Sequence, residues 1–105
     1  MRRLIPFVFL LIASSAFAKN PCKDLDGIYY SIMKKRQQGT PIVKQMDLVD
    51  KTEKKLPNEK ALHDLLRKAV ISAYEEPRFQ VEENQEKAAQ DFANSWTTAC
   101  YKSFS

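Results

Sequence analysis

Apolar residues recur at helical spacing in four segments of the chain, and no stretch of any length alternates apolar and polar residues as a strand would. The first segment starts at Asn20, a residue type that caps helices, followed by Pro21, a residue type favoured at the first helical position. Gly39 is predicted to end this helix. The spacing places five residues on its apolar face, namely Cys22, Leu25, Tyr29, Ile32 and Met33.

The second segment starts with a similar pair, Thr40 and Pro41, and is expected to end near Asp50. The stretch KTEKKLP that follows is predicted to be a charged connector. The apolar stripe of this shorter helix is predicted to contain Ile42, Val43, Met46 and Val49.

The third segment has the strongest apolar pattern in the chain. Asn58 is predicted to cap it and Pro77 to end it, because the residue before a proline is disfavoured in helical geometry. Its stripe consists of Leu62, Leu65, Leu66, Ala69, Val70, Ala73 and Tyr74.

A fourth helix is predicted after PRFQV, from about Glu82 to about Lys102. One side of this helix is formed by Ala89, Phe92, Ala93, Trp96, Ala99 and Cys100. The sequence contains no internal repeat, low-complexity tract or domain boundary. The pattern therefore predicts an all-α fold, a single small four-helix domain at residues 19–105.

The chain begins with the features of a cleaved signal peptide at residues 1–18. Two arginines precede an apolar run at 4–12, and Ala16 and Ala18 are the small residues that a signal peptidase reads, so cleavage is expected after Ala18. A membrane anchor would need about 20 apolar residues, and a lipoprotein signal would place cysteine directly after small residues. The prediction is a periplasmic or secreted protein with no membrane span after cleavage.

Export changes how the two cysteines, Cys22 and Cys100, are interpreted. In an oxidising compartment, an even number of cysteines in a short chain predicts a disulfide. In the cytosol, the same cysteines would suggest metal or redox chemistry. Both cysteines lie on predicted apolar faces, which independently supports a bridge between the start of the first helix and the end of the fourth. Closing a loop of this length contributes at most roughly 4–5 kcal/mol in the loop-entropy model.

Charge is unevenly distributed, although the net charge of the whole chain is only +4 and the loss of residues 1–18 would leave +2. Basic residues predominate at 34–60 and acidic residues at 75–91. The basic residues are interpreted in two ways. They could form a patch that binds an anionic partner, such as a phosphorylated lipid head group or an acidic protein. Alternatively, they belong to a solvated helix end, where the helix dipole favours cations. No nucleic-acid partner is expected, because no aromatic residues interleave with the charges. The candidate cations are Lys34, Lys35 and Arg36.

The stretch AYEEPRF combines a helix end with charged and aromatic residues. As a binding site, it would let Arg78 present its planar guanidinium to a carboxylate or phosphate, framed by Tyr74 and Phe79. As a structural element, it would let Phe79 fill the space between two helices while Arg78 pairs with a carboxylate of the protein. The carboxylates in question are those of Glu75, Glu76 and Asp91.

Three further residues are considered as candidates for function. Tyr101 falls off the predicted core face of the last helix, as does Phe104 beyond it, so both are aromatics that could contact a partner. His63 is the only histidine and is predicted to lie at the surface or at the boundary of the core. The chain offers no converging nucleophile and base, no set of metal ligands and no cofactor motif, so no catalytic residue, metal or cofactor is predicted.

Three stretches resemble a group of small exported α-helical proteins of unknown function from Gram-negative bacteria and their phages or prophages. They are Cys22, AYEEPRF at 73–79 and ENQEKAAQDFANSWTTACYK at 83–102. The resemblance implies periplasmic export and a bridge between Cys22 and Cys100. It implies no catalytic activity.

These features predict a non-enzymatic binding protein that docks on an envelope or phage-derived protein through a helix face. A second hypothesis is a periplasmic stress or chaperone-like factor, in which the contrast between residues 34–60 and 75–91 lets pH change the association state. A third hypothesis, an enzyme, lacks a catalytic set of residues. The surface predicted to contact the partner contains Lys34, Lys35, Arg36, Arg78, Phe79 and Tyr101.

Overall fold

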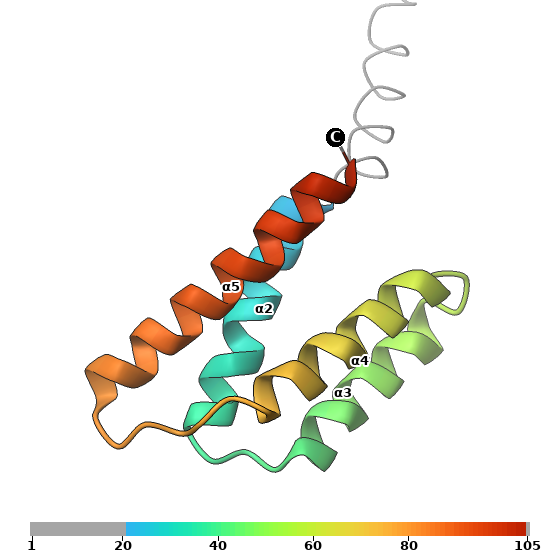
Figure 1. Ribbon diagram of the computed structural model, residues 1–105. Helices are drawn as coiled ribbons and strands as arrows, with labels where there is room; N and C mark the ends of the chain where they lie inside the picture. The colour runs from blue at the N-terminus through green and yellow to red at the C-terminus, as the bar shows by residue number, and fades with distance from the viewer. Residues whose placement is uncertain (1–20, 105) are drawn as a thin grey trace, which may run out of the picture.

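The computed structural model describes residues 21–104, which form four helices (Figure 1). The helices are α2 (Cys22–Gln37), α3 (Ile42–Lys55), α4 (Lys60–Tyr74) and α5 (Glu82–Phe104). The described residues include no strand, so the predicted all-α four-helix fold is confirmed. The predicted signal peptide at 1–18 and the predicted cap at Asn20 lie outside the described residues.

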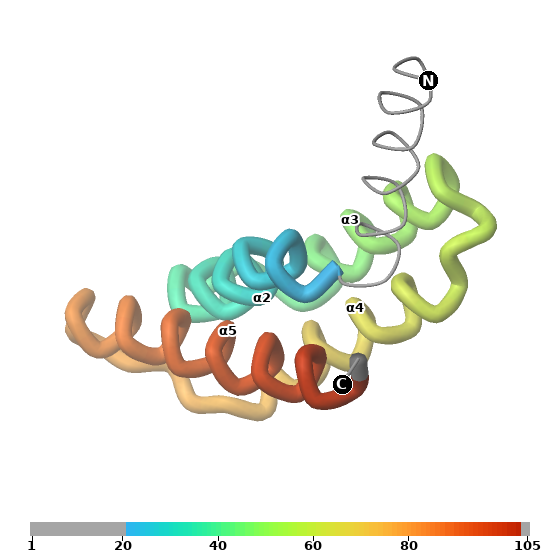
Figure 2. Tube along the Cα trace, turned by 90° about the horizontal axis from the view of Figure 1, so that it is seen from above, coloured from blue at the N-terminus to red at the C-terminus, as the bar shows by residue number. Residues whose placement is uncertain are grey.

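The helices are arranged as two antiparallel pairs. α2 lies beside α5, α3 lies beside α4, and α2 also contacts α4, so α2 joins the two pairs (Figure 1). Figure 2 shows, from a second direction, that the end of the α3–α4 pair with its connecting loop lies away from α2 and α5. Within residues 21–104 no helix is both long enough and apolar enough to cross a membrane.

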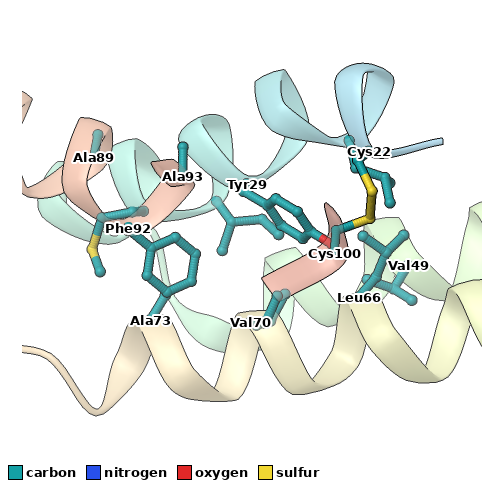
Figure 3. Close-up of a cluster of buried hydrophobic side chains, with 14 residues drawn as sticks. Cys22, Tyr29, Val49, Leu66, Val70, Ala73, Ala89, Phe92, Ala93 and Cys100 are labelled. Carbon is teal, nitrogen blue, oxygen red and sulfur yellow. A yellow bond between two sulfur atoms is a disulfide. The ribbon is translucent and has the colours of Figure 1, made fainter. Parts of the chain in front are cut away.

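The predicted apolar faces form one core at the meeting of the two pairs (Figure 3). Tyr29 lies fully buried at its centre, and its ring centroid is 5.7 Å from that of the partly buried Trp96. Two predictions were wrong: Val43 is 64% exposed, and Ala99 is exposed. Both lie at the edge of their helical stripes.

The disulfide between Cys22 and Cys100 is present, as predicted. The two Cα atoms are 5.6 Å apart, and both residues are buried. The bond joins the first turn of α2 to the last part of α5, next to Val49 and Leu66 at one end of the core (Figure 3). It therefore fixes the α2–α5 pair at the end opposite to the α2–α3 connection.

α2 ends at Gly39 in a Schellman motif. The backbone N–H of Thr40 donates to the carbonyl of Lys35 at 3.0 Å, and the N–H of Gly39 donates to the carbonyl of Arg36 at 3.1 Å. Gly39 has a φ of 91°, a left-handed conformation that only glycine adopts without strain. The predicted end of the first helix is confirmed.

α3 is longer than predicted, because residues 51–55 continue the helix instead of forming a connector. Arg67 of α4 explains this extension. Its Nη2 lies 2.9 Å from Oδ1 of Asp50 and 2.5 Å from Oε1 of Glu53, so the additional turn of α3 is held against α4. The stretch KTEKKLP was predicted to be a charged connector, but one of its charged residues, Glu53, makes a contact between helices.

The predicted caps of α3 and α4 were each misplaced by one residue. Pro41 and Glu59 occupy the N-cap positions, and neither makes a side-chain capping bond. The loop before α4 is organised around the carbonyl of Leu56, which accepts the N–H of Glu59 at 3.1 Å. This turn places Glu59 at the helix boundary that Asn58 was predicted to occupy.

Candidate functional site

The end of α2 is bound to the segment between α4 and α5 through the side chain of Gln37. This side chain is fully buried, its Nε2 donates to the carbonyl of Pro77 at 2.8 Å, and its Oε1 accepts the backbone N–H of Phe79 at 2.7 Å. The Gln37 amide thus satisfies two backbone groups of a segment that has no helix of its own. We call the contact between residues 36–39 and residues 76–79 the α2-end contact.

Arg78 contributes to the α2-end contact. Its Nε donates to the carbonyl of Gln37 at 3.2 Å, and its guanidinium lies over Gly39, where a Cβ atom would be 3.2 Å from Nη2. The predicted pairing of Arg78 with a nearby carboxylate is therefore not what the structure shows. Gly39 serves two purposes here, since it takes a positive φ and leaves room for the guanidinium.

Arg36 completes the α2-end contact and connects it to Tyr74 at the end of α4. Arg36 donates to the carbonyl of Glu76 at 2.9 Å through Nη2, and its guanidinium lies 5.0 Å from the centre of the Tyr74 ring. The Tyr74 hydroxyl donates to the carbonyl of Thr40 and accepts from Nε2 of the buried Gln45 at 3.0 Å. Tyr74 therefore frames Arg36 and not Arg78.

Lys34 is used in an ion pair between α2 and α5. Its Nζ lies 2.6 Å from Oε1 of Glu86, and the hydroxyl of Tyr30 donates to the same carboxylate at 2.6 Å. The hydrogen bond from Lys34, followed by that from Tyr30, lowers the pKa of Glu86 below its ordinary value. The same hydrogen bonds raise the pKa of Lys34 and the pKa of Tyr30.

The side chains of the other three predicted partner-binding residues, Lys35, Phe79 and Tyr101, take no part in these contacts and do not lie together; only the backbone N–H of Phe79 does, through its bond to Gln37. Phe79 precedes α5 and is exposed, whereas the exposed Tyr101 is near the opposite end of that helix. At 1.5 Å per residue, nearly the whole of α5 separates them, about 30 Å. Lys35 lies on α2 and lines a groove that the sequence did not predict.

This groove is formed by one side of α2, α3 and α4 and has a volume of about 420 Å³. Its lining is mostly apolar, and Ile28, Leu48 and Leu56 remain 43–47% exposed although they share the same concave surface. We call it the apolar groove. The residues that characterise it are Gly27, Ile28, Leu48, Leu56, Leu62 and Val70.

Sequence reasoning missed the apolar groove because Ile28 and Leu48 are isolated apolar residues next to the core stripes of their helices. An apolar residue off the main stripe is common on any protein surface, so neither one alone is a signal. The informative feature would have been that two neighbouring helices each carry such a residue. Only the packing of α2 against α4, and of α4 against α3, brings these residues together.

His63 is fully buried, so its predicted place at the surface or the core boundary was wrong. Its Nε2 lies 2.8 Å from the carbonyl of Leu56, and its Nδ1 has no hydrogen-bond partner in the structure. The α3–α4 loop covers the imidazole and gives it this backbone partner. His63 therefore fixes the loop that carries Leu56 into the apolar groove.

In the part of the chain that the structure describes, no group of three or more histidine, cysteine or acidic residues is placed to hold a metal ion. The chain matches no known protein-family model, no curated protein and no solved structure. The resemblance of AYEEPRF to exported proteins of unknown function stays a prediction. In this chain that stretch forms one side of the α2-end contact.

Proposed function

We propose that the protein is a non-enzymatic binding protein of the periplasm or the cell exterior, and that it docks on an envelope or phage-derived protein. The apolar groove carries this proposal. Folded proteins bury most large apolar side chains, and a concave surface that leaves Ile28, Leu48 and Leu56 exposed is typical of a surface that another molecule covers.

Export is supported by two independent features. The first 18 residues have the pattern of a cleaved signal peptide, and the bond between Cys22 and Cys100 is of the kind that persists in oxidising compartments. N-terminal sequencing of the chain recovered from the periplasm or the culture medium tests this part. The expected first residue is Lys19, whereas an intact Met1 would contradict export by a cleaved signal.

Three charged residues that the sequence suggested for partner binding are used within the fold, which favours docking through apolar contact instead. Lys34, Arg36 and Arg78 hold parts of the fold together, so their charges are partly satisfied within the protein. A substrate site would need such groups turned towards an open cavity. The apolar groove offers a different surface, with large side chains that lose their contact with water when a partner binds.

Site-specific photocrosslinking in the native host tests the proposal. A benzophenone amino acid replaces Leu48 or Leu56 in the groove, and Ile71 on α4 outside the groove serves as the control. All three residues are 47% exposed, so their accessibility is matched. The expected result is crosslinking of both groove positions to the same envelope or phage-derived protein, identified by mass spectrometry, and no such product from position 71.

The proposal is wrong if the groove positions give no crosslinked protein, or the same products as position 71. Detection of substrate turnover by the purified chain would also contradict a non-enzymatic role.

A further inference from the structure

Three lysines lie along the outer side of the apolar groove on α3. Lys44, Lys51 and Lys55 are separated from Leu48 by four, three and seven residues, and these spacings place all four residues on one side of the helix. The three lysines are exposed, and none forms an ion pair within residues 21–104. Lys35 adds a fourth cation on the α2 wall of the groove.

Of the three acidic residues of α3, only Asp47 lies near these lysines, one turn from Lys44 and one turn from Lys51. Asp50 and Glu53 lie on the side of α3 that faces α4, where both pair with Arg67. Asp24, one turn before Ile28, is an exposed acidic residue on α2, the opposite wall. The α3 side of the groove therefore carries three exposed lysines against one exposed carboxylate, and this excess of positive charge complements an acidic partner.

Gly27 is a second, independent feature of the groove. It lies within α2, where glycine is less favourable than alanine, and its φ is not positive. A Cβ atom at this position would meet nothing within 4 Å, so packing inside the described protein does not require glycine. Because Gly27 lines the groove, its missing side chain allows the backbone of a bound molecule to come close to α2.

The shape of the groove favours a helix as the bound molecule. Its walls are helices, whose backbone N–H and C=O groups are already paired, so an extended peptide would leave its own backbone groups unpaired against apolar side chains. A helix satisfies these groups internally. The lining residues from Gln45 to Leu56 span about 16 Å at 1.5 Å per residue, which matches a partner helix of about three turns.

We propose that the apolar groove binds an amphipathic α-helix with an acidic flank, in the helix-in-groove mode of recognition. This inference rests on the proposed docking function and specifies the partner. The apolar face of the helix packs on Ile28, Leu48 and Leu56, its acidic flank faces the α3 lysines, and its backbone approaches Gly27.

Selection from a displayed peptide library tests the inference. The library contains 14-residue peptides with apolar residues fixed at helical spacing and all other positions randomised, and the target is the exported chain with its disulfide intact. The expected binders are acidic. Binding measured by fluorescence anisotropy is expected to weaken about tenfold when Lys51→Glu and Lys55→Glu are combined, and also in about 0.5 M salt.

A second double variant with the same change in net charge serves as the control. Lys54→Glu combined with Lys68→Glu changes the net charge equally. Lys54 lies six residues after Leu48, on another side of α3, and Lys68 lies on α4. This control is expected to change the affinity less than twofold. An equal loss in both double variants would show that only net charge matters, which would overturn the acidic-flank assignment.

Substitution of Gly27 separates binding from folding. Gly27→Ala is expected to raise the thermal midpoint by about 2–8 °C, because alanine is the better helix former, and to weaken peptide binding. Gly27→Leu is expected to weaken binding at least about tenfold in a chain that remains folded. A structural role for Gly27 would lower the midpoint of both variants.

Other outcomes distinguish this inference from the proposed function. Binders that are neutral or basic, yet sensitive to Gly27→Leu, would overturn the acidic flank and leave groove docking in place. A dimer in sedimentation that Gly27→Leu dissolves would assign the groove to a second copy of this chain. If no selected peptide depends on Gly27, the inference is wrong, and crosslinking from Leu48 and Leu56 decides separately whether the groove is a docking surface.

Discussion

The side-chain amide of Gln37 accepts the backbone N–H of Phe79 at 2.7 Å, 42 residues away in the sequence. Together with the bond from Nε2 to the carbonyl of Pro77, it connects the end of α2 to the segment that leads into α5. Two further carbonyls of this segment, those of Glu76 and Phe79, accept bonds from the side chains of Arg36 and Gln85.

Replacement of Gln37 is therefore expected to destabilise the protein. Gln37→Leu keeps the apolar bulk but leaves the N–H of Phe79 and the carbonyl of Pro77 without these partners, which should lower the free energy of unfolding by about 2–3 kcal/mol. Urea denaturation measures the change. The control is Gln38→Leu at the neighbouring exposed position, with an expected change within about 0.5 kcal/mol. Equal effects at the two positions would show that the amide contributes little.

Removal of the buried hydroxyl of Tyr29 is expected to stabilise the protein, unlike the replacement of Gln37. It has no hydrogen-bond partner in the structure, and burial raises the pKa of this residue. Tyr29→Phe removes an unsatisfied polar group and keeps the ring, so it is expected to stabilise the protein by about 1 kcal/mol, or about 4–8 °C in thermal midpoint. Tyr74→Phe is the matched control, because its hydroxyl has two partners and its loss should lower the midpoint. A lower midpoint for Tyr29→Phe would reveal a partner for its hydroxyl.

Helix positions and core faces were largely predictable because they depend on local spacing. The faces containing Tyr29, Ile32 and Met33 on α2, and Phe92 and Ala93 on α5, are buried as predicted. Each face follows from the 3.6-residue period, which requires no knowledge of the neighbouring helices.

Buried polar residues could not be predicted in the same way. Gln37, Gln45 and His63 are buried, and each is bonded to a backbone carbonyl in another part of the chain. A polar side chain is normally placed at the surface from sequence alone, since its burial is favourable only when such a partner is present. The apolar groove also depends on contacts between distant segments, because its walls come from three helices. It could therefore not be predicted from local spacing either.

The contact between Lys34 and Glu86 predicts a dependence of stability on pH. The pKa of Glu86 is lowered in the folded state by hydrogen bonds from Lys34 and then Tyr30, so the ionised carboxylate favours folding. This contribution is fully present above the ordinary value of 4.5 and is lost as the pH falls through the lowered value. Urea denaturation of the parent chain and Glu86→Gln at pH 7, 5 and 3 measures it.

The parent chain is expected to be more stable than Glu86→Gln at pH 7, and the difference should shrink towards pH 3. Glu83→Gln is the control, because the Glu83 carboxylate has no ion pair within residues 21–104. A difference between the parent and Glu86→Gln that stays constant from pH 7 to pH 3 would contradict this assignment of the lowered pKa.

The bond between Cys22 and Cys100 closes a loop of 78 residues in sequence separation, which is nearly the whole described chain. Such a bond stabilises chiefly by restricting the unfolded chain, and the effect grows with loop length. Replacing both cysteines by serine is therefore expected to lower the free energy of unfolding by about 2–5 kcal/mol, a large share of the stability of a small domain.

Intact mass with and without reductant, together with thermal melts of the oxidised and reduced forms, checks this prediction. The oxidised form should be lighter by the two hydrogens lost on forming the bond, and it should melt at a higher temperature. Because the bond joins the start of α2 to the end of α5, reduction should expose the backbone of these turns to hydrogen exchange before it affects the α3–α4 pair. Two free thiols in protein purified from the periplasm, or identical melting of both forms, would refute a stabilising role for the disulfide.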